Sequence, residues 1–304
     1  MNLKHLDAAC AAYQKSIDVN DAERLAFFRE IWEVQARNAS LAAAARSYEV
    51  PAAERLQHLY RQGISVFSQF PVLQDEACFS ATAMQLCDVI TSRGTFDPAV
   101  SEVLRGIDWP RFAAETPLEL GGLDPAAYLQ TAADILCDEG VCDAALQAVL
   151  AVVALALRAM LDVPAAAVSA ALDDEWLTET APVRCPVCGG EATAARVGEG
   201  EKSRGHGRGK TLWCAQCGTS WGIERIRCGR CGMQNQSNLH YFNVEGDEAH
   251  RLAICDACGR YLRTCYSDDA LAPFAFEVED VLMANLDAIA CDPRFQQNTF
   301  TAAQ

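Results

Sequence analysis

Apolar residues recur at spacings of three and four along residues 1–172, and this period predicts a series of amphipathic helices. The stretch is rich in alanine and leucine and has few β-branched runs, a composition typical of helix. Asp97 and Asp124 each precede a proline, which places a capping side chain just before a helix start. The expected helices are Leu3–Ile17, Asp21–Arg37, Ala52–Gln62, Asp75–Thr91, Pro98–Arg105, Pro125–Leu136, Cys142–Leu161 and Ala165–Leu172.

The most apolar segment is Ala144–Leu157, which runs for 14 residues between Asp143 and Arg158. A helix needs about 20 apolar residues to cross a bilayer. The triplet Asp162-Val163-Pro164 is expected to end this helix, because proline cannot continue the hydrogen-bond ladder. We therefore expect a buried core helix and no membrane insertion.

The pattern changes to strands beyond a polar stretch at 173–184. Aromatic and β-branched residues between glycine turns predict hairpins. The expected strands are Thr211–Trp213, Ser220–Ile226, Leu239–Val244 and Arg251–Ile254. A last helical pattern covers Glu277–Ala290, and the residues that follow it are expected to fray.

Charge divides the chain at the same place. Residues 1–180 hold 12 Lys+Arg and 26 Asp+Glu, a net of −14, whereas residues 181–304 hold 13 and 15, a net of −2, which gives the −16 of the whole chain. Nearly all the acidity therefore belongs to the helical part. An acidic surface keeps a protein soluble, and it could also steer a basic segment of a partner toward the helices.

Four Cys-x-x-Cys pairs lie within the 74 residues 185–258. A gap of two residues lets one turn of backbone direct two sulfurs at one ion, and two such turns complete a tetrahedral shell. The gaps between successive pairs are 25, 10 and 23 residues, and the long gaps suit the hairpin of a ribbon site. Sequential pairing gives two metal sites, with an interleaved pairing left open. Site 1 is Cys185, Cys188, Cys214 and Cys217, and site 2 is Cys228, Cys231, Cys255 and Cys258.

A shell of four cysteines leaves no position for water or substrate, which excludes hydrolytic metal catalysis and favours a structural or electron-carrying role. Zinc and iron both suit four thiolates, and two metal ions per chain are expected. A glycine follows the second cysteine of every pair. A positive φ at Gly189, Gly218, Gly232 and Gly259 would let backbone N–H groups turn toward the sulfurs.

These patterns predict a multidomain α plus small β fold. An acidic all-helical domain is expected at 1–172 and a linker at 173–184. Two tandem rubredoxin-like or zinc-ribbon modules follow at 185–225 and 226–266, and a C-terminal helix and tail complete the chain at 267–304.

The first residues mix acid and base and lack the apolar core of a secretory signal, so the chain is expected in the cytoplasm. Its 15 cysteines would stay reduced there unless a metal holds them. The spare thiols fall in apolar patterns and are expected to pack as small hydrophobes. They are Cys10, Cys78, Cys87, Cys137, Cys142 and Cys291. Cys265, close to the ribbon, is the one candidate for redox chemistry or ligand exchange, although core packing is favoured there too.

No catalytic motif stands out. The five histidines form no HxxxH or HExxH pattern, and no histidine site is expected. No Ser-His-Asp order, paired-carboxylate motif or dinucleotide fingerprint stands out either.

Nucleic-acid binding is a further alternative for ribbons of this kind. The stretch Arg196–Arg230 holds eight basic and three acidic residues with two tryptophans among them. Its glycine-rich part, Gly198–Lys210, matches no phosphate-binding template and is expected to be the exposed tip of a hairpin. The total charge of −16 repels a polyphosphate, which disfavours this alternative.

The cysteine-rich part resembles the formate dehydrogenase accessory (maturation) protein family FdhE. The resemblance rests on three motifs within residues 183–266. They are Cys185-Pro-Val-Cys-Gly, Leu212-Trp-Cys-Ala-Gln-Cys-Gly-Thr-Ser-Trp221 leading to Cys228-Gly-Arg-Cys-Gly, and Cys255-Asp-Ala-Cys-Gly-Arg-Tyr-Leu262.

The resemblance implies a cytoplasmic, non-catalytic factor with rubredoxin-like sites, and it favours iron over zinc. It also implies binding to the catalytic subunit of exported, molybdenum-dependent formate dehydrogenases before or during export. The ligand role carries over to the eight cysteines of the two sites. A rubredoxin-like electron-transfer protein is the main alternative, and homodimer formation is left open.

Overall fold

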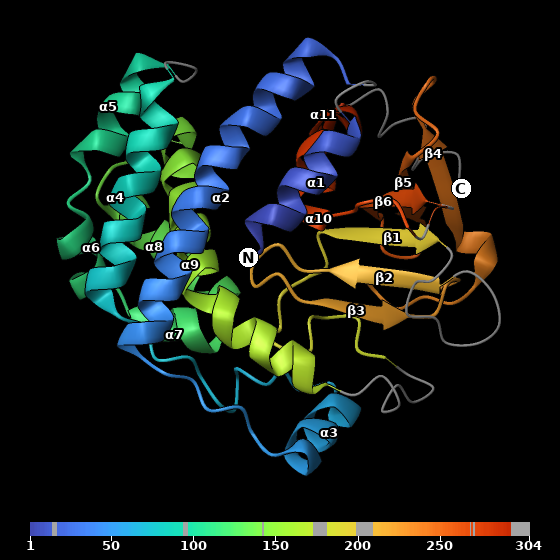
Figure 1. Ribbon diagram of the computed structural model, residues 1–304, viewed down its shortest axis with the longest axis horizontal. Helices are drawn as coiled ribbons and strands as arrows, with labels where there is room; N and C mark the ends of the chain where they lie inside the picture. The colour runs from blue at the N-terminus through green and yellow to red at the C-terminus, as the bar shows by residue number, and fades with distance from the viewer. Residues whose placement is uncertain are drawn as a thin grey trace.

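The computed structural model of the protein describes residues 1–13, 17–93, 97–141, 143–172, 181–198, 209–267, 269 and 271–292. Helices lie on one side of the molecule and a sheet on the other (Figure 1). The helices of the described part before residue 173 are α1 (Leu3–Tyr13), α2 (Val19–Ala45), α3 (Ala53–Gln62), α4 (Glu76–Ser92), α5 (Pro98–Gly106), α6 (Trp109–Glu115), α7 (Leu118–Leu123), α8 (Pro125–Asp138) and α9 (Asp143–Ala171).

Aspartates cap several of the helix starts, as the capping patterns predict. The carboxylates of Asp97 and Asp124 accept backbone N–H groups at the starts of α5 and α8. Asp108 caps α6 in the same way before Pro110. The short helices α6 and α7 were not among those expected, although Asp108 and Pro110 carry the same start signal as Asp97 and Pro98.

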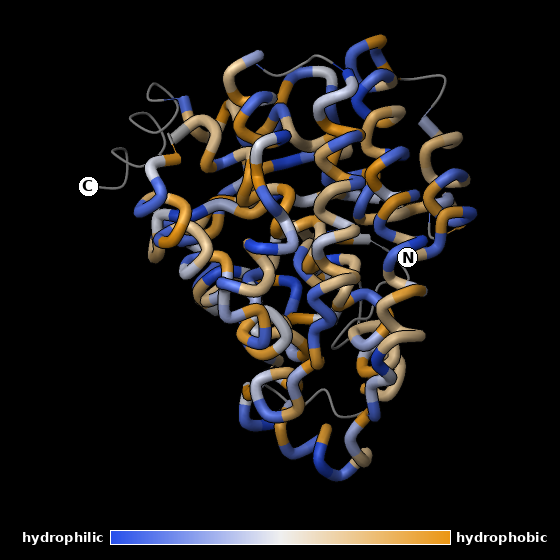
Figure 2. Tube along the Cα trace, turned by 90° about the vertical axis from the view of Figure 1, so that its left-hand side faces the viewer, coloured by the Kyte–Doolittle hydropathy of each residue, from blue (hydrophilic) through white to orange (hydrophobic). Residues whose placement is uncertain are grey.

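Helix α9 runs along the centre of the helical part and contacts α2, α4, α5 and α8. Its first half, from Val149 to Leu157, packs into the main helical core. Hydrophobic and hydrophilic positions alternate along the surrounding helices (Figure 2). Apolar residues of these helices are buried in the same core.

The expectation that α9 ends before Pro164 is wrong. The helix continues through the proline to Ala171. Its second half buries Leu161, Ala165 and Val168 in a second core that also contains the first cysteine set. This packing offsets the backbone hydrogen bond that Pro164 cannot donate.

The continuous helix is also longer than the apolar segment Ala144–Leu157 of the sequence. Within the described residues, Ala144–Ala171 is one helix with the length and hydropathy of a membrane span. Of its most apolar window, 61% is buried inside the fold. That burial is the pattern of a core helix.

The sheet combines both cysteine-rich modules. Its strands are β1 (Ala194–Gly198), β2 (Gly209–Trp213), β3 (Ser220–Ile223), β4 (Leu239–Asn243), β5 (His250–Cys255) and β6 (Arg260–Ser267). Their order is β3-β2-β1-β6-β5-β4, and only β1 and β6 pair in parallel. The sequence reading missed these two strands, which join the modules into one sheet.

The C-terminal helix expected at Glu277–Ala290 consists of two short helices, α10 (Phe276–Leu282) and α11 (Ala284–Cys291), which meet at Met283. Helix α10 contacts α1 and α2, whereas α11 contacts β5 and β6. The rings of Phe276 and Trp213 stack with their centroids 5.6 Å apart. This segment therefore lies between the helical part and one face of the sheet.

Several expected features lie outside the described residues. They are most of the linker, at 173–180, the hairpin tip at 199–208, Cys142 and the tail at 293–304.

Candidate metal centres

The structure brings the four sulfurs of site 1 together. Cys185 and Cys188 precede β1, and Cys214 and Cys217 lie in the turn between β2 and β3. The Sγ atoms of Cys185 and Cys217 are 3.5 Å apart, and those of Cys188 and Cys214 are 3.6 Å apart. Bonds of about 2.3 Å to a tetrahedral ion would place sulfurs about 3.8 Å apart. All four cysteines are buried, so this cluster fits a closed four-thiolate shell.

Site 2 is assembled in the same way nearer the surface. The Sγ atoms of Cys228 and Cys258 are 4.0 Å apart, and those of Cys231 and Cys255 are 3.7 Å apart. Cys231 is exposed and Cys258 is half-buried, whereas the other two are buried. The sequential grouping thus matches the structure, and the second cluster differs from the first in having an open edge.

A glycine closes each cysteine turn. All four have a positive φ, between 63° and 81°. Their N–H groups donate to the carbonyl of the first cysteine of the pair, as in Gly218 to Cys214 at 2.8 Å. The sulfurs instead accept from the residue two places after a cysteine: Gly190 N–H donates to Cys188 Sγ and Arg230 N–H to Cys228 Sγ. The glycines shape the turns, and neighbouring amides contact the sulfurs.

The thiols of site 1 interact strongly when they hold protons. Burial raises the pKa of Cys185 well above its ordinary value of 9.0. Burial also opposes ionisation of Cys217, but hydrogen bonds from the other three thiols outweigh it and lower the pKa of Cys217. The thiolate of Cys217 thus accepts hydrogen bonds from the three neighbouring thiols. A bound cation would replace those protons, because the thiolate is the form that binds metal.

The helical part holds site 1 from one side. The N–H of Val66 donates to the carbonyl of Pro186 and that of Phe67 to Val187, each at 2.9 Å. The guanidinium of Arg158, on α9, lies against Gly218 and pairs with Glu277 at 3.0 Å. The first cysteine cluster is therefore packed into the helical part as well as into the sheet.

A groove reaches the edge of this cluster. It has a volume of about 390 Å³ and runs between the second half of α9 and the Cys217 turn. Asp162 and Ser169 line one wall, and Cys217 and Thr219 line the other.

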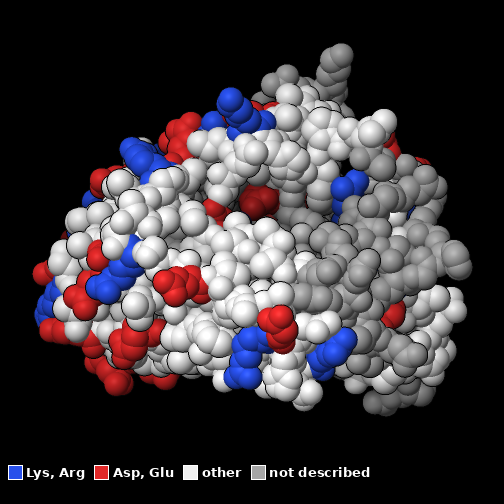
Figure 3. Space-filling view, turned by 60° about the horizontal axis from the view of Figure 1, so that its bottom comes forward, with Lys and Arg blue, Asp and Glu red and all other residues white. Residues whose placement is uncertain are grey.

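Acidic side chains gather over the helical side of the surface, as the charge count predicts (Figure 3).

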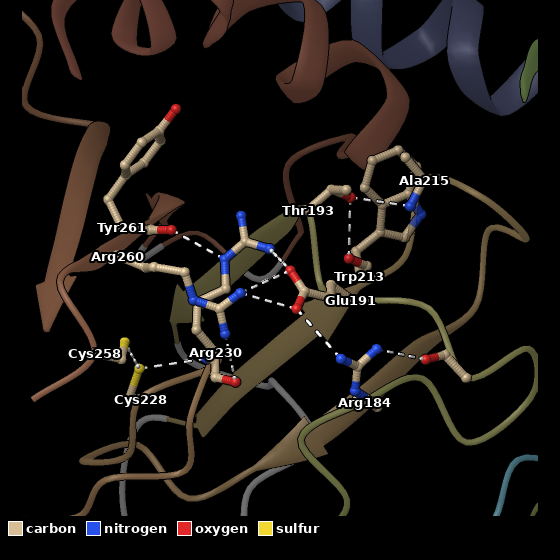
Figure 4. Close-up of polar contacts among 11 residues, drawn as sticks. Arg184, Glu191, Thr193, Trp213, Ala215, Cys228, Arg230, Cys258, Arg260 and Tyr261 are labelled. Atoms are coloured by element: carbon tan, nitrogen blue, oxygen red, sulfur yellow. Dashed lines mark hydrogen bonds and ion pairs between the residues drawn. The ribbon is translucent and has the colours of Figure 1, made fainter. Parts of the chain in front are cut away.

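Glu191 joins the loops of the two clusters. Its carboxylate accepts hydrogen bonds from Arg230 at 3.1 Å and from Arg260 at 2.9 Å. Arg184 approaches the same carboxylate at 3.6 Å (Figure 4). Hydrogen bonds from Arg260 lower the pKa of Glu191 despite partial burial. This carboxylate, which the sequence did not single out, links residues beside Cys185, Cys228 and Cys258.

Among the described residues of the basic stretch, Lys210 and Arg227 contact groups of the fold. Lys210 is buried, its Nζ donates to the carbonyl of Arg227 at 2.8 Å, and burial lowers its pKa to about 8. Arg227 pairs with Glu224 at 3.0 Å. These cations contact protein groups beside site 2, which weakens the case for a phosphate-binding face.

The spare cysteines differ from one another. Cys87 is buried as expected, and Cys10 and Cys78 are partly buried. The expectation is wrong for Cys137 and Cys291, which are exposed at the ends of α8 and α11.

Cys265 packs in the interior, as favoured, but beside His250 and Glu279. His250 thus lies in a group of possible ligands that the histidine spacing did not indicate. Burial disfavours its charge, yet hydrogen bonds to Asp247, Cys265 and Glu279 outweigh burial and raise the pKa of His250 to about 12.

Comparison with known proteins supports the resemblance to FdhE. The FdhE homologue of Cronobacter sakazakii is 31% identical over 117 residues, and FdhE of Escherichia coli is 29% identical over the same length. Each match covers 38% of this chain and 34% of the relative. The crystal structure of FdhE from Pseudomonas aeruginosa superposes on 98% of this chain and 91% of its own, with a TM-score of 0.50 and 15% identity. No family model matches the chain.

The chain is similar to FdhE proteins over 117 residues, and it has the fold of the Pseudomonas aeruginosa FdhE structure. The matched sequence spans about a third of the curated FdhE relatives, whereas the structural likeness extends over nearly the whole fold. The likeness to FdhE proteins and the two four-cysteine clusters agree with each other.

Proposed function

We propose that this chain is a non-catalytic accessory protein in the maturation of formate dehydrogenase. The likeness to FdhE proteins carries the proposal. On this proposal the chain acts in the cytoplasm and binds the catalytic subunit of an exported, molybdenum-dependent formate dehydrogenase before or during export.

The eight cysteines would hold two metal ions, one in each cluster. The sulfur separations of 3.5–4.0 Å suit four thiolates around one ion, which favours zinc or iron over harder cations. Iron is the choice that the family resemblance favours. A closed shell leaves no position for substrate, so the ions hold the sheet and its loops together.

Charge supports a role for the helical part in binding a partner. Residues 1–180 carry a net charge of −14, and acidic side chains outnumber basic ones on the helical side of the surface (Figure 3). A basic segment of the partner, such as an arginine-bearing export signal, would be attracted by this field. Such binding weakens as salt is added.

The proposal is tested in cells that lack this chain. Wild type is expected to restore formate dehydrogenase activity and to co-purify with the catalytic subunit under anaerobic conditions. Cys188→Ser should lose both functions together with metal, because the buried shell of site 1 would be incomplete. The matched control is Cys291→Ser, at an exposed cysteine outside both clusters.

Two results would contradict the proposal. One is full formate dehydrogenase activity in cells without the chain. The other is a Cys188→Ser protein with unchanged metal content and unchanged capture of the catalytic subunit.

Electron transfer is a second candidate function, and the open edge of site 2 favours it. Cys231 is exposed and Cys258 half-buried, so an iron ion there would lie near the surface. Purified protein with ferric iron in four thiolates would be red and would bleach on reduction. Colourless protein that contains only zinc would exclude this function.

A further inference from the structure

A third group of metal-binding side chains lies away from the two cysteine clusters. His250 on β5 stands directly opposite Cys265 on β6 in the antiparallel register, and Glu279 comes from α10, which packs over them. Residue exposure is 7% for His250, 2% for Cys265 and 1% for Glu279. The nitrogen, sulfur and oxygen that they offer all lie within 4.8 Å of one another.

The imidazole of His250 is held in a fixed orientation. Its Nδ1 lies 2.9 Å from the Asp247 carboxylate, which also accepts the backbone N–H groups of Ala249 and His250. Nε2 therefore faces the group, 2.8 Å from the carboxylate of Glu279. Histidines that bind metal through one ring nitrogen commonly donate the other N–H to a carboxylate, which orients the ring.

The carboxylate of Glu279 is equally well positioned. The hydroxyl of Tyr13, from α1, lies 2.8 and 2.9 Å from its two oxygens. The Glu279 side chain is 2% exposed. Buried carboxylates are costly unless a cation or several hydrogen bonds compensate the charge.

We propose that His250, Cys265 and Glu279 form a third metal site, which takes a divalent transition metal of the zinc class. The donor set supports that class, because imidazole and thiolate prefer zinc and its neighbours, whereas magnesium and calcium require oxygen ligands. Bonds of about 2.0–2.3 Å to a tetrahedral ion place donors about 3.3–3.8 Å apart. A group within 4.8 Å would therefore close around an ion by shifts of about 1 Å.

A nucleophilic role for Cys265 is excluded by its burial. A cysteine beside a histidine and an aspartate also occurs in thiol hydrolases. Those enzymes expose the sulfur to substrate, however, and Cys265 is only 2% exposed. A small ion fits this closed interior, whereas an organic substrate does not.

The site would connect parts of the chain that are distant in sequence. Its ligands come from two strands and α10, and Tyr13 adds α1 through its contact with Glu279. An ion here would fasten the C-terminal helix and the first helix to the sheet. The proposal does not depend on the role in formate dehydrogenase maturation, because it concerns metal content alone.

Metal content of the purified full-length protein tests the proposal. The protein is stripped by a chelator and reloaded anaerobically with zinc alone, and the zinc per chain is measured by mass spectrometry. Wild type is expected to hold one zinc more than Cys265→Ala or Glu279→Gln. The control Cys87→Ala, at a buried cysteine in the helical core, should match wild type.

Glu279→Gln keeps a side chain that can still bond to Tyr13 and His250, so it separates loss of a ligand from loss of the fold. Circular dichroism checks that this variant is folded. Equal zinc content in wild type and folded Glu279→Gln overturns the proposal. Wild-type protein that saturates at two zinc ions overturns it as well, even if every variant fails to fold.

Discussion

Replacing Gly218 by alanine is predicted to destabilise the protein far more than the same change at Gly259. Both glycines close a cysteine turn with positive φ, at +78° and +63°. An L-residue in that conformation costs about 1–2 kcal/mol. At Gly259 a new Cβ would have open space, so the backbone cost is the whole effect.

At Gly218 the Cβ would also collide with the guanidinium of Arg158, because the two would approach closer than 3.0 Å. The Arg158 side chain is 7% exposed and pairs with Glu277 at 3.0 Å and Asp162 at 3.5 Å. Moving it would break a buried ion pair, which costs about 3–5 kcal/mol. Gly218→Ala should therefore cost about 4–7 kcal/mol in all, against about 1–2 kcal/mol for Gly259→Ala.

Equilibrium urea denaturation of the metal-loaded variants measures both costs. A double-mutant cycle then assigns the excess to the collision. In an Arg158→Met background, Gly218→Ala should cost only the backbone strain of about 1–2 kcal/mol. Equal destabilisation by the two glycine variants in the wild-type background would refute the reasoning.

Three further predictions concern stability and metal retention. Leu157→Ala in the centre of α9 should lower the free energy of unfolding by about 2–5 kcal/mol. The control Met84→Ala, at an exposed position, should change it by less than about 1 kcal/mol. Thermal denaturation measures both. Asp75→Ala should cost about 1 kcal/mol at neutral pH by removing the cap of α4. Hydrogen bonds from Cys78 lower the pKa of Asp75. The stability that Asp75 contributes is therefore complete above the ordinary pKa of 3.8 and is lost as pH falls through the lower folded pKa. Urea titrations of wild type and variant should converge in acid. A chelator should remove metal from site 2 before site 1, because Cys231 is exposed, and the metal content of partly stripped Cys231→Ser and Cys188→Ser proteins checks that order.

The sequence predicted the cysteine grouping because both the spacing and the geometry are local. A knuckle needs two cysteines and a glycine in five residues, and the hairpin length then selects its partner. Most helices were also predicted, since their apolar period and aspartate caps are read within one segment. Strand β6 carried a usable signal as well, in the alternating run Arg260-Tyr-Leu-Arg-Thr-Cys-Tyr-Ser267.

Other features depend on contacts that no single segment contains. Strand β1 has the sequence Ala-Ala-Arg-Val-Gly, which favours no strand by itself and is held by β2 and β6 on either side. Pro164 remains helical because Leu161, Ala165 and Val168 are buried against the sheet side of the molecule. The group of His250, Cys265 and Glu279 needs both the β5–β6 register and the placement of α10.

The parallel pairing of β1 with β6 sets an order for folding during synthesis. Ala194 pairs with Arg263 and Gly198 with Ser267, so one edge of β1 lacks its neighbour until the last strand leaves the ribosome. Until then the first module can gather its cysteines but presents an open strand edge, which is a site for wrong pairing. Such distant contacts also form slowly. A chain that stops after the first module would therefore be prone to aggregate. The sheet can be completed only after synthesis has passed residue 267.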